Sequence, residues 1–132
     1  MTLTITIDRG LGQPVYDQVA DQIRLLIASG GLAPGASLPP VRRLAGELGV
    51  NLNTIARAYR LLEGEGFLDI RRRAGVKVAA PAAEVEHSTR AKLLEQVRIP
   101  LARLRQAGVS NDELLEIVRR ELLAFDGGDR ED

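Results

Sequence analysis

The sequence contains no cysteine and only one histidine, His87. Without cysteine the chain can form neither a disulfide nor a thiolate metal site, and a single imidazole cannot supply the histidine cluster of a zinc site. We therefore expect no metal, no cofactor and no redox chemistry. His87 lies in a segment predicted below to be a linker, and we assign it no functional role.

Long apolar runs are missing as well. No segment approaches the roughly 20 apolar residues of a membrane-spanning helix. The N-terminal residues MTLTITID also lack the basic region and apolar run of a secretion signal. The sequence predicts a soluble, cytoplasmic protein with no membrane partner.

Patterns typical of catalysis are also absent from the sequence. It has no paired acid and base, no nucleophile with a nearby base and no glycine-rich loop that would cradle a phosphate. Tyr16 and Tyr59 lie on predicted buried helical stripes, so we interpret both as core residues. The sequence predicts that the protein is not an enzyme.

The formal net charge is zero, but the charges are distributed unevenly over the 132 residues. Residues 1–80 hold 10 basic and 7 acidic groups, a net charge of +3, whereas residues 81–132 hold 8 and 11, a net charge of −3. This asymmetry favours a basic binding module followed by an acidic remainder. The length suits one compact domain with an appendage.

Residues 38–68 contain two short amphipathic helical patterns separated by a glycine. The first has an apolar stripe at i, i+3, i+4 and i+7, which consists of Val41, Leu44, Ala45 and Leu48. Pro39 and Pro40 mark its start, and Gly49 marks its end because glycine adopts the left-handed conformation without strain. Two such helices joined by one turn predict a helix-turn-helix.

The second helix is predicted to begin at Asn51, whose side chain can cap it, and to run to about residue 65. Its buried stripe consists of Ile55, Ala58, Tyr59 and Leu62. Asn53, Arg57 and Arg60 follow at i, i+4 and i+7 on the opposite face. Arginine can pair with guanine and asparagine with adenine in the major groove, so this face suits DNA. The alternative is an ordinary solvated helix face.

Three further elements are predicted before the helix-turn-helix. Residues 2–7 alternate polar and apolar side chains, which favours a short half-buried strand. Residues 14–29 have a helical apolar period that starts at a proline and ends at a glycine pair. Residues 32–37 contain Pro34-Gly35, which is typical of a tight turn.

Two short apolar runs, residues 67–70 and 76–80, follow the helix-turn-helix and predict a hairpin. A hairpin at this place is typical of the wing of a winged helix, which can reach phosphates or the minor groove. The basic residues of the predicted wing are Arg71, Arg72, Arg73 and Lys77. We expect this cluster to neutralise phosphates, the alternative being simple solvation of the loop.

Residues 79–85, AAPAAEV, are typical of a hinge, and two helices are predicted beyond it. The first begins at Ser88 and ends near Gly108, with a kink or a break expected near Pro100. The second begins with Ser110 and Glu113 in capping-box spacing and ends at Gly127. The predicted domains are thus residues 1–80, a linker of residues 81–87, a helical dimerisation region of residues 88–126, and a frayed tail of residues 127–132.

The two C-terminal helices carry more leucine and valine than a lone helical hairpin can bury. We expect them to dimerise, which would present two recognition helices to DNA half-sites about one turn apart. The alternative is that the hairpin packs back on its own winged helix in a monomer.

Residues 14–80 resemble the GntR family of bacterial transcription regulators. The resemblance is carried by PVYDQVADQIRLLIASGGLAPGASLP, by VRRLAGELGVNLNTIARAYRLLEGEGFL and, more weakly, by RRRAGVKVA. The segment VNLNTIARAYRLLE and the short two-helix tail are most similar to those of the YtrA subfamily, which lacks a large effector domain. The 52 residues after Ala80 are too few for the aminotransferase-like domain of a related branch.

The resemblance implies a homodimer that binds an inverted-repeat operator, usually as a repressor and often of its own operon with transporter genes. By matching position it implies DNA contacts for Arg42, Asn51, Asn53, Thr54 and Arg57, and a minor-groove role for the wing glycine, Gly75. The sequence departs from the family pattern at four positions, Leu52, Ala56, Arg73 and Val76. Base readout is therefore expected to depend mainly on Asn53 and Arg57.

The sequence thus predicts a mostly α fold with a small β wing, a winged helix-turn-helix followed by a C-terminal helical dimerisation hairpin. Its predicted function is sequence-specific DNA binding in transcriptional regulation. The alternative is a winged-helix module that binds protein and uses its arginines for solubility. No small-molecule effector can be named from the sequence.

Overall fold

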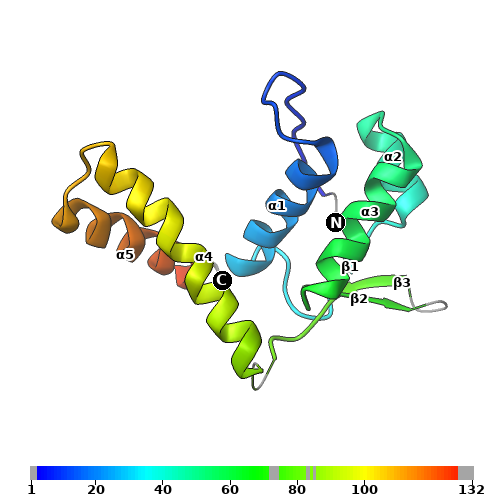
Figure 1. The fold of residues 1–132 in the computed structure, drawn as a ribbon. Coiled ribbons are helices and arrows are strands. Elements are labelled where there is room, and N and C mark those ends of the chain that lie inside the picture. Colours follow the sequence, from blue (N-terminus) through cyan, green and yellow to red (C-terminus); the bar gives the residue numbers. More distant parts are fainter. Residues whose placement is uncertain (1–2, 72–74, 83, 85, 128–132) are drawn as a thin grey trace. The chain divides into compact units, whose positions relative to one another are not determined.

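The computed structural model describes residues 3–71, 75–82, 84 and 86–127. It divides into two compact units, Met1–Pro81 and Ala82–Asp132. The first unit contains α1 (Val15–Ala28), β1 (Ser37–Leu38), α2 (Val41–Leu48), α3 (Leu52–Gly64), β2 (Leu68–Arg71) and β3 (Gly75–Val78) (Figure 1). The second contains α4 (His87–Gln106) and α5 (Asn111–Gly127). This mostly helical chain with a small antiparallel sheet confirms the predicted fold class.

The helix-turn-helix of α2 and α3 forms as predicted. Gly49 adopts the left-handed conformation with φ of 66°, and the N–H of Val50 donates to the carbonyl of Ala45 at 3.0 Å. This hydrogen bond pairs a carbonyl that the end of α2 would otherwise leave without a donor. Asn51 then caps α3, since its Oδ1 accepts a hydrogen bond from the N–H of Asn53 at 2.7 Å.

The sheet is antiparallel with strand order β1-β3-β2. In the hairpin of β2 and β3, Asp69 pairs with Lys77 and Ile70 with Val76. The strand β1 was not predicted, because two residues are too short to show an alternating pattern. It follows the predicted turn at Pro34-Gly35, which closes through a 2.9 Å bond from the N–H of Ala36 to the carbonyl of Ala33.

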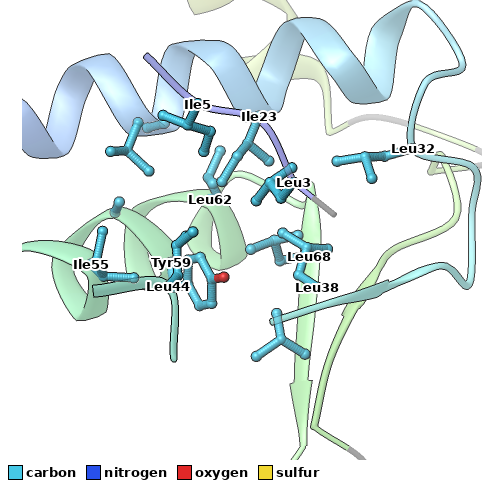
Figure 2. Close-up of a cluster of buried hydrophobic side chains, with 14 of the residues drawn as sticks. Leu3, Ile5, Ile23, Leu32, Leu38, Leu44, Ile55, Tyr59, Leu62 and Leu68 are labelled. Carbon is cyan, nitrogen blue, oxygen red and sulfur yellow. The ribbon is translucent and has the colours of Figure 1, made fainter. Parts of the chain in front are cut away.

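The core of the first unit lies among α1, α2, α3, the sheet and the N-terminal segment (Figure 2). Val19, Ile23, Leu44, Ile55 and Leu62 are completely buried in it. Removal of this apolar surface from water is the main stabilising contribution to the unit.

Tyr59 is only 1% exposed, which confirms its prediction as a core residue. Its hydroxyl donates a 2.7 Å hydrogen bond to the carbonyl of Pro39, at the entrance to α2. Burial raises the pKa of Tyr59 above its ordinary value, and the charge of Glu47 raises it further. The tyrosine therefore ties α3 to the start of α2 in its neutral form.

The prediction of a strand over residues 2–7 is wrong for the described residues 3–7, which pair with no strand. The alternation itself is real, since Leu3 and Ile5 are buried and Thr4 and Thr6 are exposed. Glutamine side chains of α1 take the place of a partner strand, because an amide group offers the same donor and acceptor as a backbone peptide.

Two glutamines provide this pairing. Gln22 accepts from the N–H of Thr6 at 2.9 Å and donates to its carbonyl at 2.6 Å. Gln18, which is 4% exposed, makes the same pair of bonds with Asp8, both at 2.8 Å. The segment is thus anchored to α1 by side-chain hydrogen bonds and by burial of its apolar residues.

The second unit is a helical hairpin. Ser110 caps α5 as predicted, since its hydroxyl accepts from the N–H of Glu113 at 3.2 Å. The helix α4 begins one residue earlier than predicted, at His87, which is therefore outside the linker. It also continues through Pro100, so of the two expected alternatives, a kink or a break, the break into two helices is wrong. The proline leaves the carbonyl of Gln96 without its helical donor, but this face is exposed and water can bond there.

Apolar side chains of the second unit are largely exposed. Leu114 is its one buried apolar residue in the described part of the chain, and α4 has none. The large apolar residues left exposed are Leu93, Leu94, Val97, Ile99, Leu104, Leu115, Val118, Leu122 and Leu123. The predicted linker residues Ala83 and Val85 and most of the predicted tail, residues 128–132, lie outside the described residues.

Candidate nucleic-acid interface

The exposed face of α3 carries the side chains that the sequence predicted there. Asn53, Arg57 and Arg60 are all exposed, while Ile55, Ala58, Tyr59 and Leu62 on the other side are buried. The helix is therefore held against the core by one face and offers an amide and two guanidinium groups on the other. These groups can form paired hydrogen bonds with the edges of bases.

A hollow of about 510 Å³ lies at the start of α3 and is lined by Val15, Tyr16, Asn51, Asn53, Thr54 and Arg57. Four of the predicted contact residues thus lie together. The side-chain oxygen of Asn51 is used by the helix cap, which leaves its amide N–H groups as the donors it can offer. Thr54 is half-buried and presents a hydroxyl at the hollow.

Tyr16 is half-buried and packs against the edge of the core, so its prediction as a core residue is only partly right, because the residue also belongs to this surface. It lies in the first turn of α1, where Cζ of Arg57 is 3.8 Å from the centre of its ring. Nη2 of Arg57 also donates to the tyrosine hydroxyl at 3.3 Å. Helical periodicity could not reveal this contact, because the two residues are 41 positions apart in different helices.

A second hollow, of about 560 Å³, lies between α1 and α3 on the other side of the Tyr16–Arg57 contact. Its lining includes Arg60 and also Arg24, whose Nε and Nη2 donate to the carboxylate of Glu65 at 2.8 and 3.0 Å. This paired bond raises the pKa of Arg24 above its ordinary value. The ion pair ties α1 to the end of α3 and was not predicted from the sequence.

Arg42 lies exposed on α2 and lines neither hollow. Its neighbour Arg43 is ion-paired with Glu47 at 3.2 Å. Arg42, Arg57, Arg60 and Lys77 have no carboxylate within 4 Å among the described residues. These four cations are therefore available to an anionic partner.

The hairpin of β2 and β3 holds the remaining predicted site residues. Gly75 begins β3 with φ of 77°, a conformation that a side chain would strain. Lys77 is exposed in the same strand, and Arg71 is ion-paired with Asp69 at 3.0 Å. Arg72 and Arg73 lie outside the described residues.

Within the described part of the chain, no group of three or more histidine, cysteine or acidic side chains could hold a metal ion. The same residues include no helix long and apolar enough to cross a membrane.

Residues 15–78 match the family described as bacterial regulatory proteins, gntR family. The HTH-type transcriptional repressor YtrA of Bacillus subtilis is 30% identical over 129 residues, which are 97% of this chain and 99% of that protein. The structure of YtrA from Sulfolobus acidocaldarius, a GntR-family transcription factor, is 40% identical, with a TM-score of 0.61 over 74% of this chain and 97% of that one.

The crystal structure of AraR(DBD) in complex with operator ORX1 is also similar, with a TM-score of 0.52 and 28% identity. It covers 60% of this chain and 99% of that chain. The repressor YtrA matches over almost its whole length, and the matched operator complex contains the DNA-binding domain of AraR. The chain therefore belongs to the GntR family and is a DNA-binding transcription regulator of the YtrA type rather than an enzyme.

Proposed function

We propose that the chain is a homodimeric repressor that binds an inverted-repeat operator through α3 of each protomer. The observation that carries this proposal is the exposed face of α3, where Asn53, Arg57 and Arg60 lie free of described carboxylates. Similarity to a DNA-binding domain in complex with an operator supports operator binding by this chain.

The site residues divide into two proposed roles. Asn53 and Arg57 read base edges in the major groove, because their side chains can form paired bonds with adenine and guanine. Arg42 and Arg60 bind phosphates at the flanks of the recognition helix. Asn51 and Thr54 donate from the hollow at the start of α3, where a phosphate oxygen can also be accommodated.

The hairpin of β2 and β3 is proposed to be the wing. Gly75 allows its backbone to approach the minor groove closely, since glycine has no side chain. Lys77, together with Arg72 and Arg73, adds positive charge for the neighbouring phosphates.

Dimerisation is assigned to α4 and α5. Leu115, Val118 and Leu122 recur at i, i+3 and i+7 on α5, and each is at least 45% exposed. A stripe of this period is typical of a helix face that packs against another helix. A second copy of the chain would bury it and bring two recognition helices to a symmetric operator.

The repressor activity rests on the full-length similarity to the repressor YtrA. By family resemblance we expect the operator in the promoter of the chain's own operon, with transporter genes beside it.

Selection of bound duplexes from a random pool tests the proposal. We expect the selection to recover an inverted repeat with half-sites about one helical turn apart. The chain should also block transcription from a promoter that contains this repeat. A pool that shows no enriched sequence would instead favour the alternative, a winged-helix module that binds protein.

A further inference from the structure

Arg57 is the one arginine whose guanidinium lies over an aromatic ring in the described part of the chain. We propose that Tyr16 is a positioning residue that holds Arg57 in the conformation that reads its base, so that α1 takes part in sequence discrimination. This inference rests on the proposed function, because it concerns how the recognition helix reads DNA.

Tyr16 is held firmly relative to α3. Val19 and Ile23 of α1 are completely buried in the shared core, and the paired ion bond from Arg24 to Glu65 joins the same two helices. The backbone that carries Tyr16 is therefore fixed relative to the backbone that carries Arg57, and the half-buried ring lies against the guanidinium. A ring fixed in this way restricts a side chain that would otherwise populate many rotamers.

The contact leaves Arg57 able to bind DNA. The ring covers one face of the guanidinium, and one N–H of Nη2 donates to the tyrosine hydroxyl at 3.3 Å. A guanidinium carries five N–H donors, so four remain for the two parallel bonds that read guanine. The tyrosine thus fixes the orientation of the group without using up its donors.

Without the ring, Arg57 would have other partners. Asp17 lines the same hollow of about 560 Å³ as Arg57 and Arg60, and unlike Glu65 it is in no ion pair among the described residues. A mobile guanidinium would be attracted to the Asp17 carboxylate and away from the hollow that contains Asn53. The stacking contact opposes that rearrangement, because the arginine is already stabilised at the boundary between the two hollows.

A double-mutant cycle on the full chain tests the proposal. Affinity is measured for the duplex recovered by selection, and for its variants at each base pair, with Tyr16→Leu, Arg57→Ala and the double variant. We expect Tyr16→Leu to weaken binding about two- to fivefold when Arg57 is present and to have no effect in the Arg57→Ala background. The loss of discrimination should be confined to the base pair that Arg57→Ala also relaxes.

Two further variants separate positioning from other roles. Tyr16→Phe keeps the ring and should retain most of the affinity, which a direct contact from the hydroxyl to a phosphate would not allow. The matched control pairs Tyr16→Leu with Arg42→Ala on α2, and these two changes should be additive because Arg42 does not touch the ring. Equal weakening with and without Arg57, on every sequence, would overturn the proposal.

A measurement on the protein without DNA distinguishes failure of this inference from failure of the proposed function. The ring current of Tyr16 should shift the side-chain Nε–H resonance of Arg57, and Tyr16→Leu should remove that shift while thermal melting stays near that of the wild type. Selective DNA binding by the wild type with an additive cycle would refute the positioning role alone. A wild-type chain that binds no DNA selectively would refute both.

Discussion

The two units of the molecule handle their apolar residues in opposite ways. Sixteen of the buried apolar side chains among the described residues belong to the first unit and one, Leu114, belongs to the second. Nine of the twelve large apolar side chains left exposed belong to α4 and α5. The first unit therefore has its own core, whereas the second has an apolar surface that a partner could cover.

The two units also differ in the range of their polar interactions, which join distant segments in the first unit and neighbouring residues in the second. Hydrogen bonds between distant segments, such as those from Gln18 Nε2 to the carbonyl of Asp8 and from the Tyr59 hydroxyl to the carbonyl of Pro39, fix the first unit. Ion pairs in the second unit are local, as between Arg98 and Glu95, and such exposed pairs contribute little stability. The difference supports our proposal that the first unit, which offers a rigid surface, serves recognition and that the second serves association.

The largest expected effect comes from breaking association. Leu115→Glu combined with Leu122→Glu places two charges on the exposed stripe of α5. We expect a molar mass near 14.3 kDa instead of twice that value, by light scattering at micromolar concentration. Affinity for a two-half-site duplex should fall about 100- to 10,000-fold, because avidity is lost. A wild-type mass already near 14.3 kDa would remove the dimer from the account.

Truncation of a core residue in the first unit should lower the free energy of unfolding of that unit rather than prevent association. Leu62 is completely buried, so Leu62→Ala should lower the free energy of unfolding by about 2 to 5 kcal/mol. Leu94→Ala on α4, where the residue is 58% exposed, is the matched control and should leave the stability of the first unit unchanged. Urea denaturation measures both, and equal effects would contradict the difference between the units.

A smaller effect is expected at the surface that reads DNA. Arg57→Ala should cost about 1 to 3 kcal/mol of binding free energy and relax preference at one base pair in each half-site. Arg98→Ala removes an exposed arginine of the second unit and should change neither property. Binding titrations against single-base variants measure the difference. Uniform weakening by Arg57→Ala across all sequences would make it a phosphate contact instead.

The smallest effect concerns Tyr59. Tyr59→Phe should cost about 0.5 to 1.5 kcal/mol, because the carbonyl of Pro39 loses its donor. Burial raises the pKa of this tyrosine in the folded state, so its stabilisation is complete below the ordinary value of about 10 and is lost as the pH rises above it. Denaturation between pH 8 and roughly 11 should therefore show a steeper loss in the wild type than in the variant. Parallel curves would contradict this.

Local chemistry explains which parts of the fold could be predicted from the sequence. Gly49 and Asn51 mark the boundary between α2 and α3 by their conformational and capping preferences, which operate within a few residues. Residues 3–7 were misassigned because their partners, the amides of Gln18 and Gln22, come from another element. The expected break at Pro100 did not occur, because α4 continues there on an exposed face.

The residues of the candidate site on a single helix could be predicted from the sequence, whereas its contacts between helices could not. Helical spacing is enough to put Asn53, Arg57 and Arg60 on one exposed face. The contacts of Tyr16 with Arg57 and of Arg24 with Glu65 each join residues 41 positions apart, so only the packing of α1 on α3 reveals them.

The central claim, that the first unit binds DNA through the cations on and around α3, is tested most directly by the salt dependence of binding. The full chain is titrated with the selected duplex at several salt concentrations. We expect a slope of log affinity against log salt of about −0.9 per phosphate neutralised, and so about −3.6 or steeper if each of two protomers places at least two cations on phosphates. A slope near zero, with equal affinity for an unrelated duplex, would contradict the account.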